Sequence, residues 1–269
     1  MTKPDILMLM ADQLTSTDGL TFAAARAHMS ERSREFLPHD HFTGFIEMHI
    51  EQGPNLDCSE DRIGVVSNIV GIREARVEIR GRQNHAGTTP MHLRQDAFQA
   101  LMDFNQHINR RFETLASANT VWTLGHVELS PNASSVVPGV ARFTLQWRDG
   151  DMGRLEAMGE TLRDVAARVA QERSVTIEVA PVAGIDPSNM DAAITQALRS
   201  AAQELAPGQW RDMPSGALHD AANVSRVMPA AMLFVPSIGG ISHAFDEDTE
   251  EADLVLGLEV LNRAAQSLA

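Results

Sequence analysis

The chain has 269 residues, of which 43 % are hydrophobic and 22 % are charged, so it is long and apolar enough to form about two globular domains. Its 36 acidic residues outnumber its 22 basic residues and give a net charge of −14, which argues against nucleic acids and membranes as partners. Cys58 is the single cysteine, which excludes an internal disulfide and a cysteine-built zinc site, and no run of about 18 apolar residues is present, so we expect a cytoplasmic protein.

Residues 1–16 form an atypical N-terminal segment. Within it, Ile6–Met10 is a short apolar run that predicts a buried strand. Asp12 follows this run, where it could be a metal ligand or an ordinary aspartate of a turn.

The segments on either side of the middle of the chain alternate between strand and helix patterns. Their predicted elements are strands over 44–50, 62–70 and 231–235 and helices over 189–205 and 254–268. Asp248, with Glu251 three residues later, predicts a capped start for the last helix. This alternation predicts an α/β domain that is interrupted by a second domain.

The interrupting domain is predicted over residues 71–187. Apolar residues alternate with charged or other polar residues over 73–80 and 140–148, which predicts half-buried strands. Apolar residues at helical spacing predict helices over 91–115 and 155–169. With further strands over 120–129 and 175–179, the order is β-α-β-β-α-β, which is typical of a ferredoxin-like unit with a four-stranded antiparallel sheet and two helices on one face.

Polar residues gather at the ends of two predicted strands of the α/β part. Glu47 and His49 share one face of strand 44–50, and Glu51 continues it. Imidazole is a common zinc ligand that a carboxylate can orient, although the same pattern fits a strand that faces solvent. His243 follows strand 231–235 and the glycine pair Gly239–Gly240, a position where α/β sheets bind ligands. It is therefore a second metal-ligand candidate, while the acidic residues after it could simply favour the start of a helix.

The interrupting domain has its own candidates. His85 lies in the loop 81–90, where it could stabilise an oxyanion, and Thr88 or Thr89 could cap the following helix with Pro90 in its first turn. Arg148, on the polar face of its strand, has the planar fork that matches a carboxylate.

Ser215, His219 and Asp220 lie close together in the sequence. The strand–turn–helix elbow of serine hydrolases does not surround this serine, so we do not expect a catalytic triad.

Six groups of residues occur in a fixed order along the chain: His49–Pro54, His85–Met91, Asn132 with Val137–Gly139, Arg148–Asp149, Ser215–Ala217 with His219–Ala221, and Ser242–His243. In this order they resemble the hydantoinase/carbamoylase amidases, which include N-carbamoyl-L-amino-acid hydrolases, allantoate amidohydrolases and β-ureidopropionases of the dinuclear-metal aminoacylase and carboxypeptidase clan. Leu218 departs from the glycine that is usual in this family. Residues 1–16 instead resemble the opening strand of sulfatases, without their formylglycine motif.

The resemblance implies a metal-bearing catalytic domain, here residues 17–70 and 188–269, interrupted by a lid and dimerisation domain over 71–187. It implies a divalent metal, either zinc or manganese or cobalt, with His49 and His243 as ligands of different ions. It implies four residues that bind a small-molecule substrate, namely Gln52, Arg148, Gly216 and Ala217. It also implies that His85 and Asn132 lie near the oxyanion. Lid residues can serve the partner's site in such enzymes, so we expect a homodimer formed through the lid.

The chain lacks one part of the family pattern, and two hypotheses about its activity follow. The family begins with a stretch that carries a His-x-Asp pair, a bridging aspartate and a Glu-Glu pair, and no such stretch precedes His49. The catalytic α/β domain is therefore expected to be incomplete. The first hypothesis is a metal-dependent hydrolase of linear amide or carbamoyl bonds, and the second is a truncated, non-catalytic remnant that still dimerises.

Overall fold

The computed structural model describes residues 19, 21, 23–24 and 41–269. The chain divides into two compact units, Met1–His41 and Phe42–Ala269, and both sheets with their helices belong to the second unit. The predicted strand Ile6–Met10 and Asp12 lie outside the described residues. No helix of the described part is long and apolar enough to cross a membrane.

The first sheet carries the segments on either side of the interrupting region. Its strands are β1 (Phe45–Ile50), β2 (Ile63–Ile69), β10 (Ser188–Asn189), β11 (Trp210–Ser215) and β12 (Ala230–Val235). They follow the order β1-β12-β2-β10, and β11 also pairs with β2. β1 is parallel to β12, with His49 opposite Phe234. Every residue of β12 is buried, as suits the continuous apolar run over 231–235 that predicted this strand, whereas β1 is half-buried along its length.

Four helices accompany this sheet: α3 (Asn55–Ser59), α6 (Ala192–Leu205), α7 (Asp220–Val224) and α8 (Glu251–Leu268). α6 begins three residues later than predicted because the Asp191 carboxylate accepts hydrogen bonds from the N–H groups of Ala193 and Ile194 and so fixes the N-cap. The predicted capping by Asp248 is wrong. This side chain accepts from the N–H of Thr249, and Glu250 occupies the N-cap without a side-chain hydrogen bond.

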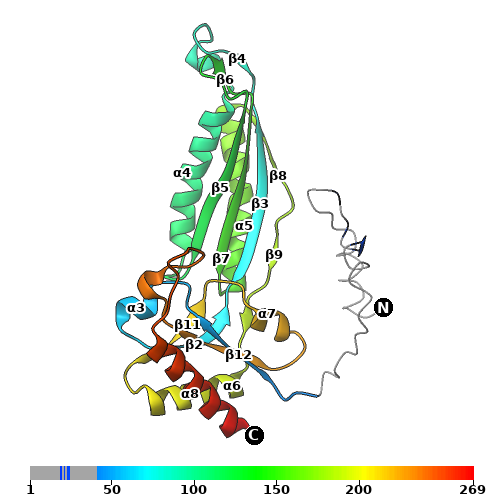
Figure 1. The fold of residues 1–269 in the computed structure, drawn as a ribbon. Coiled ribbons are helices and arrows are strands. Elements are labelled where there is room, and N and C mark those ends of the chain that lie inside the picture. The colour runs from blue at the N-terminus through cyan, green and yellow to red at the C-terminus, as the bar shows by residue number, and fades with distance from the viewer. Residues whose placement is uncertain (1–18, 20, 22, 25–40) are drawn as a thin grey trace. The chain divides into compact units, whose positions relative to one another are not determined.

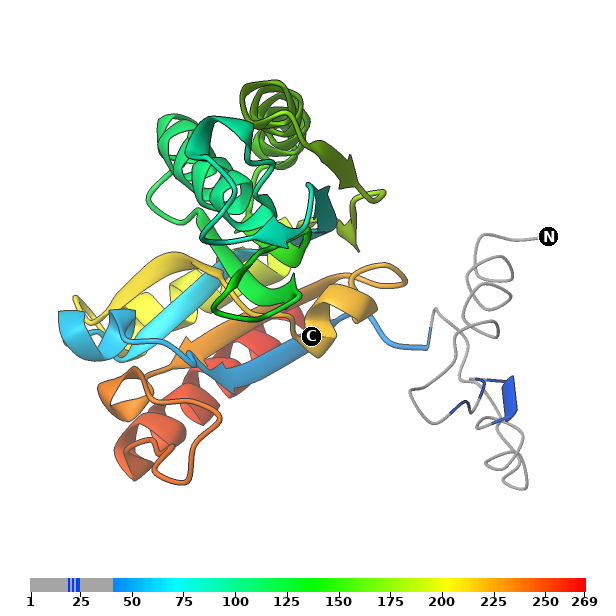
Figure 2. The ribbon, with the colours of Figure 1, turned by 90° about the horizontal axis from the view of Figure 1, so that it is seen from above.

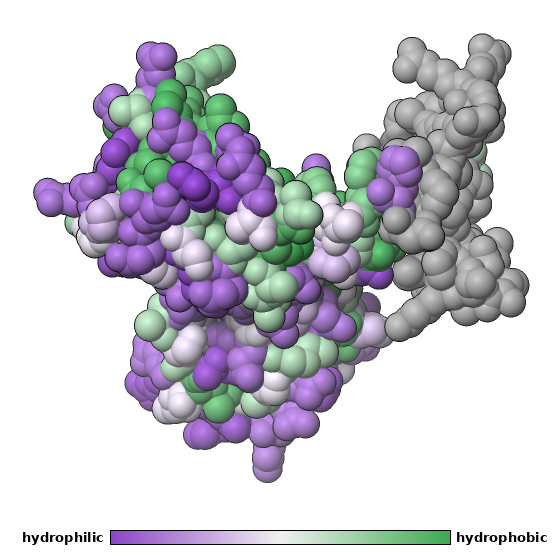
Figure 3. Space-filling view, turned by 90° about the horizontal axis from the view of Figure 1, so that it is seen from below, coloured by the Kyte–Doolittle hydropathy of each residue, from purple (hydrophilic) through white to green (hydrophobic). Residues whose placement is uncertain are grey.

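α8 packs on the sheet through Gly257, where a Cβ would lie 2.7 Å from the sulfur of Met48. Its outer side exposes large apolar residues, namely Leu254, Val255, Leu258 and Leu268. Figure 3 shows one face of the molecule, on which green hydrophobic patches lie among purple hydrophilic groups.

The second sheet is antiparallel and follows the order β5-β7-β3-β8, with β9 also paired to β3. Its elements are β3 (Gly71–Arg80), α4 (Ala97–Leu115), β5 (Val121–Ser130), β7 (Val140–Asp149), α5 (Met152–Arg173), β8 (Thr176–Val179) and β9 (Ala183–Ile185). The strands β5, β7, β3 and β8 have the order of the predicted ferredoxin-like unit. The strand β9 is an addition that the pattern did not predict. Both helices cover one face of the sheet (Figures 1 and 2).

The start of α4 differs from the prediction. Met91–Leu93 forms a short 3-10 turn, and the α-helix begins at Ala97 because the Asp96 carboxylate accepts from Phe98 and Gln99 N–H groups. The predicted caps Thr88 and Thr89 are therefore wrong. The face of α4 that packs on the sheet buries Phe104, whereas Met102 on the same helix is exposed.

A small strand pair, β4 (Asn84–His85) with β6 (Val136–Val137), lies beyond one end of this sheet. In Figure 1 it is at the end away from β12. The register pairs Arg80 with Val140 at this end and Gly71 with Asp149 at the other. A ten-residue strand spans about 30 Å, so the β4–β6 pair and Arg148 lie far apart within one chain.

Candidate active site

Five of the predicted site residues line one pocket of about 510 Å³. They come from the turn after β1, the end of β7, and the loops after β11 and β12: Gln52, Arg148, Gly216, Ala217 and His243. The fold thus brings together four segments that are far apart in the sequence.

Gln52 and His243 face each other in this pocket. Their side-chain Nε2 atoms are 3.3 Å apart, and both residues adopt left-handed backbone conformations, with φ of 59° and 58°. Such conformations cost about 1–3 kcal/mol for residues with a side chain and concentrate at functional sites. The Gln52 turn is held by its N–H, which donates to the hydroxyl of the fully buried Ser237.

The glycine pair before His243 has a steric role. Gly240 has a φ of +68°, and a Cβ there would lie 2.7 Å from both the nitrogen and the Cβ of Pro54. The backbone of the His243 loop therefore passes directly over the turn that carries Gln52. This explains the glycine at position 240, whereas a Cβ at Gly239 would meet only Ile241, at 3.7 Å.

Arg148 reaches the same pocket from the second sheet. Its Nε and Nη2 donate to the Gln146 amide oxygen, and its Nη1 donates to the Gly216 carbonyl at 3.0 Å. In the described part of the chain no carboxylate pairs with this guanidinium. Its positive charge therefore has neutral hydrogen-bond partners and is available to an anionic ligand.

Asp149, the next residue, anchors the end of β7. This buried carboxylate accepts from the hydroxyls of Thr120 and Ser117, from the N–H of Asp151 and from Arg154. Burial raises the pKa of Asp149, but the hydrogen bonds from Thr120 and Asp151 and the charge of Arg154 outweigh it and lower this pKa below its usual value.

A group of metal-ligating side chains lies next to β12. Ligand atoms of Glu47, His49 and His219 all fall within 4.8 Å of one another, and the rings of the two histidines are 4.6 Å apart. His219 is 5 % exposed, and its Nε2 has no hydrogen-bond partner. Burial, together with the neighbouring His49, lowers the pKa of His219 to about 4, although Asp220 acts in the opposite sense. Two imidazoles and a carboxylate are a donor set that suits zinc and related ions, so these residues fit the metal that the resemblance implies.

Glu47 and His219 were not predicted as members of a metal site. The alternation along 44–50 placed Glu47 beside His49, which was a usable signal. His219 comes from a segment 170 residues away, and no local pattern links it to β1. Glu51 continues the same row but serves a structural purpose, since its carboxylate accepts from Asn55 and Leu56 N–H groups at the start of α3.

Ser215 is buried, and its hydroxyl bonds to the backbone of Ala217.

His85 and Asn132 are exposed and lie at the other end of the second sheet. The Nδ1 of His85 accepts from the N–H groups of Gly87 and Thr88, so the ring organises its own loop. Within one chain the structure does not bring these two residues to the pocket.

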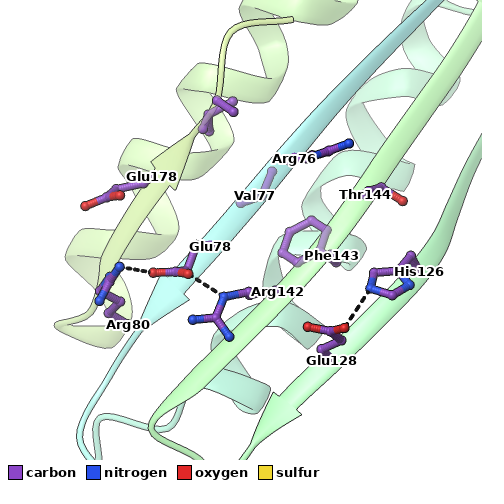
Figure 4. Close-up of a pocket in the computed structure, with 12 residues that line it drawn as sticks. Arg76, Val77, Glu78, Arg80, His126, Glu128, Arg142, Phe143, Thr144 and Glu178 are labelled. Carbon is purple, nitrogen blue, oxygen red and sulfur yellow. Dashed lines mark hydrogen bonds and ion pairs between the residues drawn. The ribbon is translucent and has the colours of Figure 1, made fainter. Parts of the chain in front are cut away.

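A larger hollow, about 590 Å³, lies on the open face of the second sheet (Figure 4). Most of its charged side chains pair with one another: Glu78 with Arg80 and Arg142, and His126 with Glu128. Arg76 and Glu178 also line the hollow. None of the predicted site residues lines it.

Comparison with known proteins gives consistent matches. Residues 18–267 match the model of peptidase family M20/M25/M40. The chain is 39 % identical over 224 residues to an N-carbamoyl-L-amino-acid amidohydrolase of Paenarthrobacter aurescens, which covers 83 % of this chain and 54 % of that protein. It is 34 % identical over 232 residues to an allantoate amidohydrolase of Escherichia coli K12, covering 86 % of this chain and 56 % of that protein.

Among solved structures, an amidase of the hydantoinase/carbamoylase family from Burkholderia phymatum has a TM-score of 0.85 and 43 % identity, over 96 % of this chain and 63 % of that one. These matches confirm the resemblance that the ordered motifs indicated. The chain spans about half the length of the curated relatives that it matches.

Proposed function

The chain belongs to peptidase family M20/M25/M40, and from this premise we propose that it works in the metal-dependent hydrolysis of linear amide or carbamoyl C–N bonds, with N-carbamoyl amino acids or ureido acids as substrates. One observation carries the proposal: Arg148, with only neutral partners among the described residues, lies in one pocket with Gln52 and His243. The names of the relatives agree with this substrate class.

Arg148 recognises the substrate carboxylate. The guanidinium presents parallel N–H donors that match a carboxylate, and the Gln146 amide and the Gly216 carbonyl already fix its orientation. Such a fixed donor loses little conformational freedom when a ligand binds.

Gln52 holds the carbamoyl end of the substrate, next to the metal-ligand candidate His243. An amide side chain can both donate and accept hydrogen bonds, so Gln52 can bind the N–H and C=O groups of a ureido moiety. The hydrogen bond from its N–H to the Ser237 hydroxyl holds the left-handed turn that presents this side chain.

His49 and His243 are the expected ligands of the divalent ions, zinc or manganese or cobalt. When bound, such an ion polarises a carbonyl oxygen and lowers the pKa of water.

His85 and Asn132 act, in this proposal, in the pocket of a second subunit. A separation of about 30 Å along the sheet is too long for them to reach the pocket of their own chain. A homodimer formed through the region 71–187 would supply them from the partner.

A second candidate function is a non-catalytic, ligand-binding dimer. It is favoured by the finding that residues 41–269 contain a single group of three neighbouring metal ligands, whereas the resemblance implies two metal ions.

The test is ammonia release by the purified full chain after it is stripped of metal and reloaded with zinc, manganese or cobalt. We expect turnover of N-carbamoyl-L-amino acids or allantoate, and little turnover of an N-carbamoyl amino amide, which lacks the carboxylate. A stable dimer that turns over none of these compounds with any metal would contradict hydrolysis by this chain and support the second candidate.

A further inference from the structure

We propose that Glu47, His49 and His219 form a complete three-ligand site for one divalent transition-metal ion. The family resemblance assigns His49 and His243 to metals and leaves Glu47 and His219 without such a role. The inference does not rest on the proposed hydrolysis, because binding of the ion is measured directly.

The backbone positions the three side chains from two directions. Glu47 and His49 are two residues apart on β1, so they project from the same face of the strand. His219 is the residue before α7, and its ring also contacts the ring of Phe234 on β12, at 5.4 Å between centroids. The resulting ligand atoms lie within 4.8 Å of one another, a spacing that a single small ion can bridge.

In Glu47 and His49, one polar atom of the side chain is hydrogen-bonded to the backbone, which leaves the other polar atom for an ion. One carboxylate oxygen of Glu47 accepts from the N–H of Ala221 at 2.7 Å, which leaves the other oxygen for an ion. His49 Nδ1 lies 2.8 Å from the carbonyl oxygen of Ile50. A carbonyl only accepts, so Nδ1 carries the proton and Nε2 keeps its lone pair. Metal-binding histidines commonly have this backbone partner on their other nitrogen.

The third ligand has a buried nitrogen that the protein leaves unsatisfied. His219 is 5 % exposed, and its Nε2 has no hydrogen-bond partner. Leaving such a group unpaired costs about 1–3 kcal/mol, so a ligand for this nitrogen is expected. With two imidazole lone pairs and a carboxylate at one place, that ligand is a cation.

His243 is not part of this group. Its Nε2 lies beside the Gln52 amide, and its side chain is not among the ligand atoms that come within 4.8 Å of one another. Three protein ligands, two imidazoles and one carboxylate, leave a further coordination position open, which is typical of catalytic rather than structural zinc sites.

The experiment is a titration of the metal-stripped full chain with Zn²⁺, followed by calorimetry and by metal analysis after dialysis. We expect one tightly bound ion per chain at the Glu47, His49 and His219 site. Removing a neighbour that only orients a ligand typically lowers metal affinity about 10–100-fold, so loss of a ligand in His219→Ala should lower it by about 100-fold or more.

Three variants make the test specific. Glu47→Gln keeps an acceptor for the Ala221 N–H but removes the charge, so it should also weaken binding without unfolding the chain. His243→Ala and the distant His126→Ala should leave the affinity for this ion within about threefold of the parent, since neither is a ligand in this site. Failure to bind Zn²⁺, or loss of binding in His243→Ala with retention in a folded His219→Ala or Glu47→Gln chain, would overturn the proposal.

Discussion

The open face of the second sheet and the pocket around Arg148 use the same kinds of residue in opposite ways. On the sheet face, arginines, glutamates and a histidine pair with one another, as Glu78 does with Arg80 and Arg142. In and beside the pocket, Arg148 has only neutral partners among the described residues, and His219 Nε2 has none. Five charged side chains of the larger hollow thus lie in ion pairs with one another, whereas Arg148 in the smaller one has no carboxylate partner among the described residues.

The difference shows that charged and polar side chains without a matching partner lie in and beside the Arg148 pocket. Exposed ion pairs contribute about 0–1 kcal/mol each and leave little charge for a ligand. Buried polar groups without a hydrogen-bond partner, and non-glycine residues with a left-handed backbone conformation, lower the stability of the fold. They are retained mainly where they serve a function. We therefore expect substitutions in the pocket to change function, and matching substitutions on the sheet face to change almost nothing.

The largest effect is expected for Arg148→Ala. Truncating one partner of a buried charged hydrogen-bonded pair costs about 2–5 kcal/mol, so kcat/KM for an N-carbamoyl amino acid should fall by about 30-fold or more. Arg142→Ala, on the sheet face, is the matched control and should retain the parental rate. Equal losses in steady-state kinetics of the two variants would remove the distinction between the two surfaces.

A mixing experiment extends the comparison to the far end of the sheet. If His85 serves the partner's pocket, Arg148→Ala and His85→Ala chains are each inactive, but a heterodimer contains one intact site. Random pairing in a symmetric dimer should then restore about a quarter of the parental activity. Mixtures that stay as inactive as the separate variants would place His85 outside the shared site.

Asp149→Asn tests the anchor beneath Arg148. Breaking its pair with Arg154 should lower the free energy of unfolding by about 3 kcal/mol, measured in urea, whereas Glu78→Gln on the sheet face should cost about 1 kcal/mol or less. An equal cost for both would argue against a special role of Asp149.

The same variant has a pH signature. Because the pKa of Asp149 is lower in the folded chain than its usual 3.8, its contribution is present above that pH and is lost as the pH falls through the lower folded value. The Asn variant should therefore lose less stability than the parent below about pH 4. Parallel stability curves for the two chains would contradict this assignment.

Gly240→Ala is expected to have a smaller effect on stability, about 1–3 kcal/mol, because it combines a positive φ with a clash against Pro54. Gly208→Ala has a comparable φ of +76° with open space around it, so it isolates the conformational cost. Gly240→Ala should additionally impair metal-dependent activity by displacing His243. A Gly240→Ala chain as stable and active as the Gly208→Ala chain would show that the close approach is unimportant.

The sequence allowed the two long strands β3 and β7 to be predicted, because alternation over 73–80 and 140–148 marks one buried face. It did not predict the shorter strands β9, β10 and β11, which show no such alternation. It did not locate the start of α4, since Asp96 competes with several equally plausible caps. The ordered motifs predicted Gln52, Arg148 and His243 as site residues, but only the sheet order shows that they share a pocket. The meeting of His219 with β1, and the distance that separates His85 from Arg148, depend on tertiary packing that no local pattern encodes.

The most direct test of the account is an anomalous diffraction map from crystals of the full chain grown with Zn²⁺ and an N-carbamoyl-L-amino acid. The account predicts a zinc peak bounded by Glu47, His49 and His219, with the ligand carboxylate on Arg148. Zinc or ligand bound instead to the charged sheet face around Glu78 and Arg142, with the pocket empty, would contradict it.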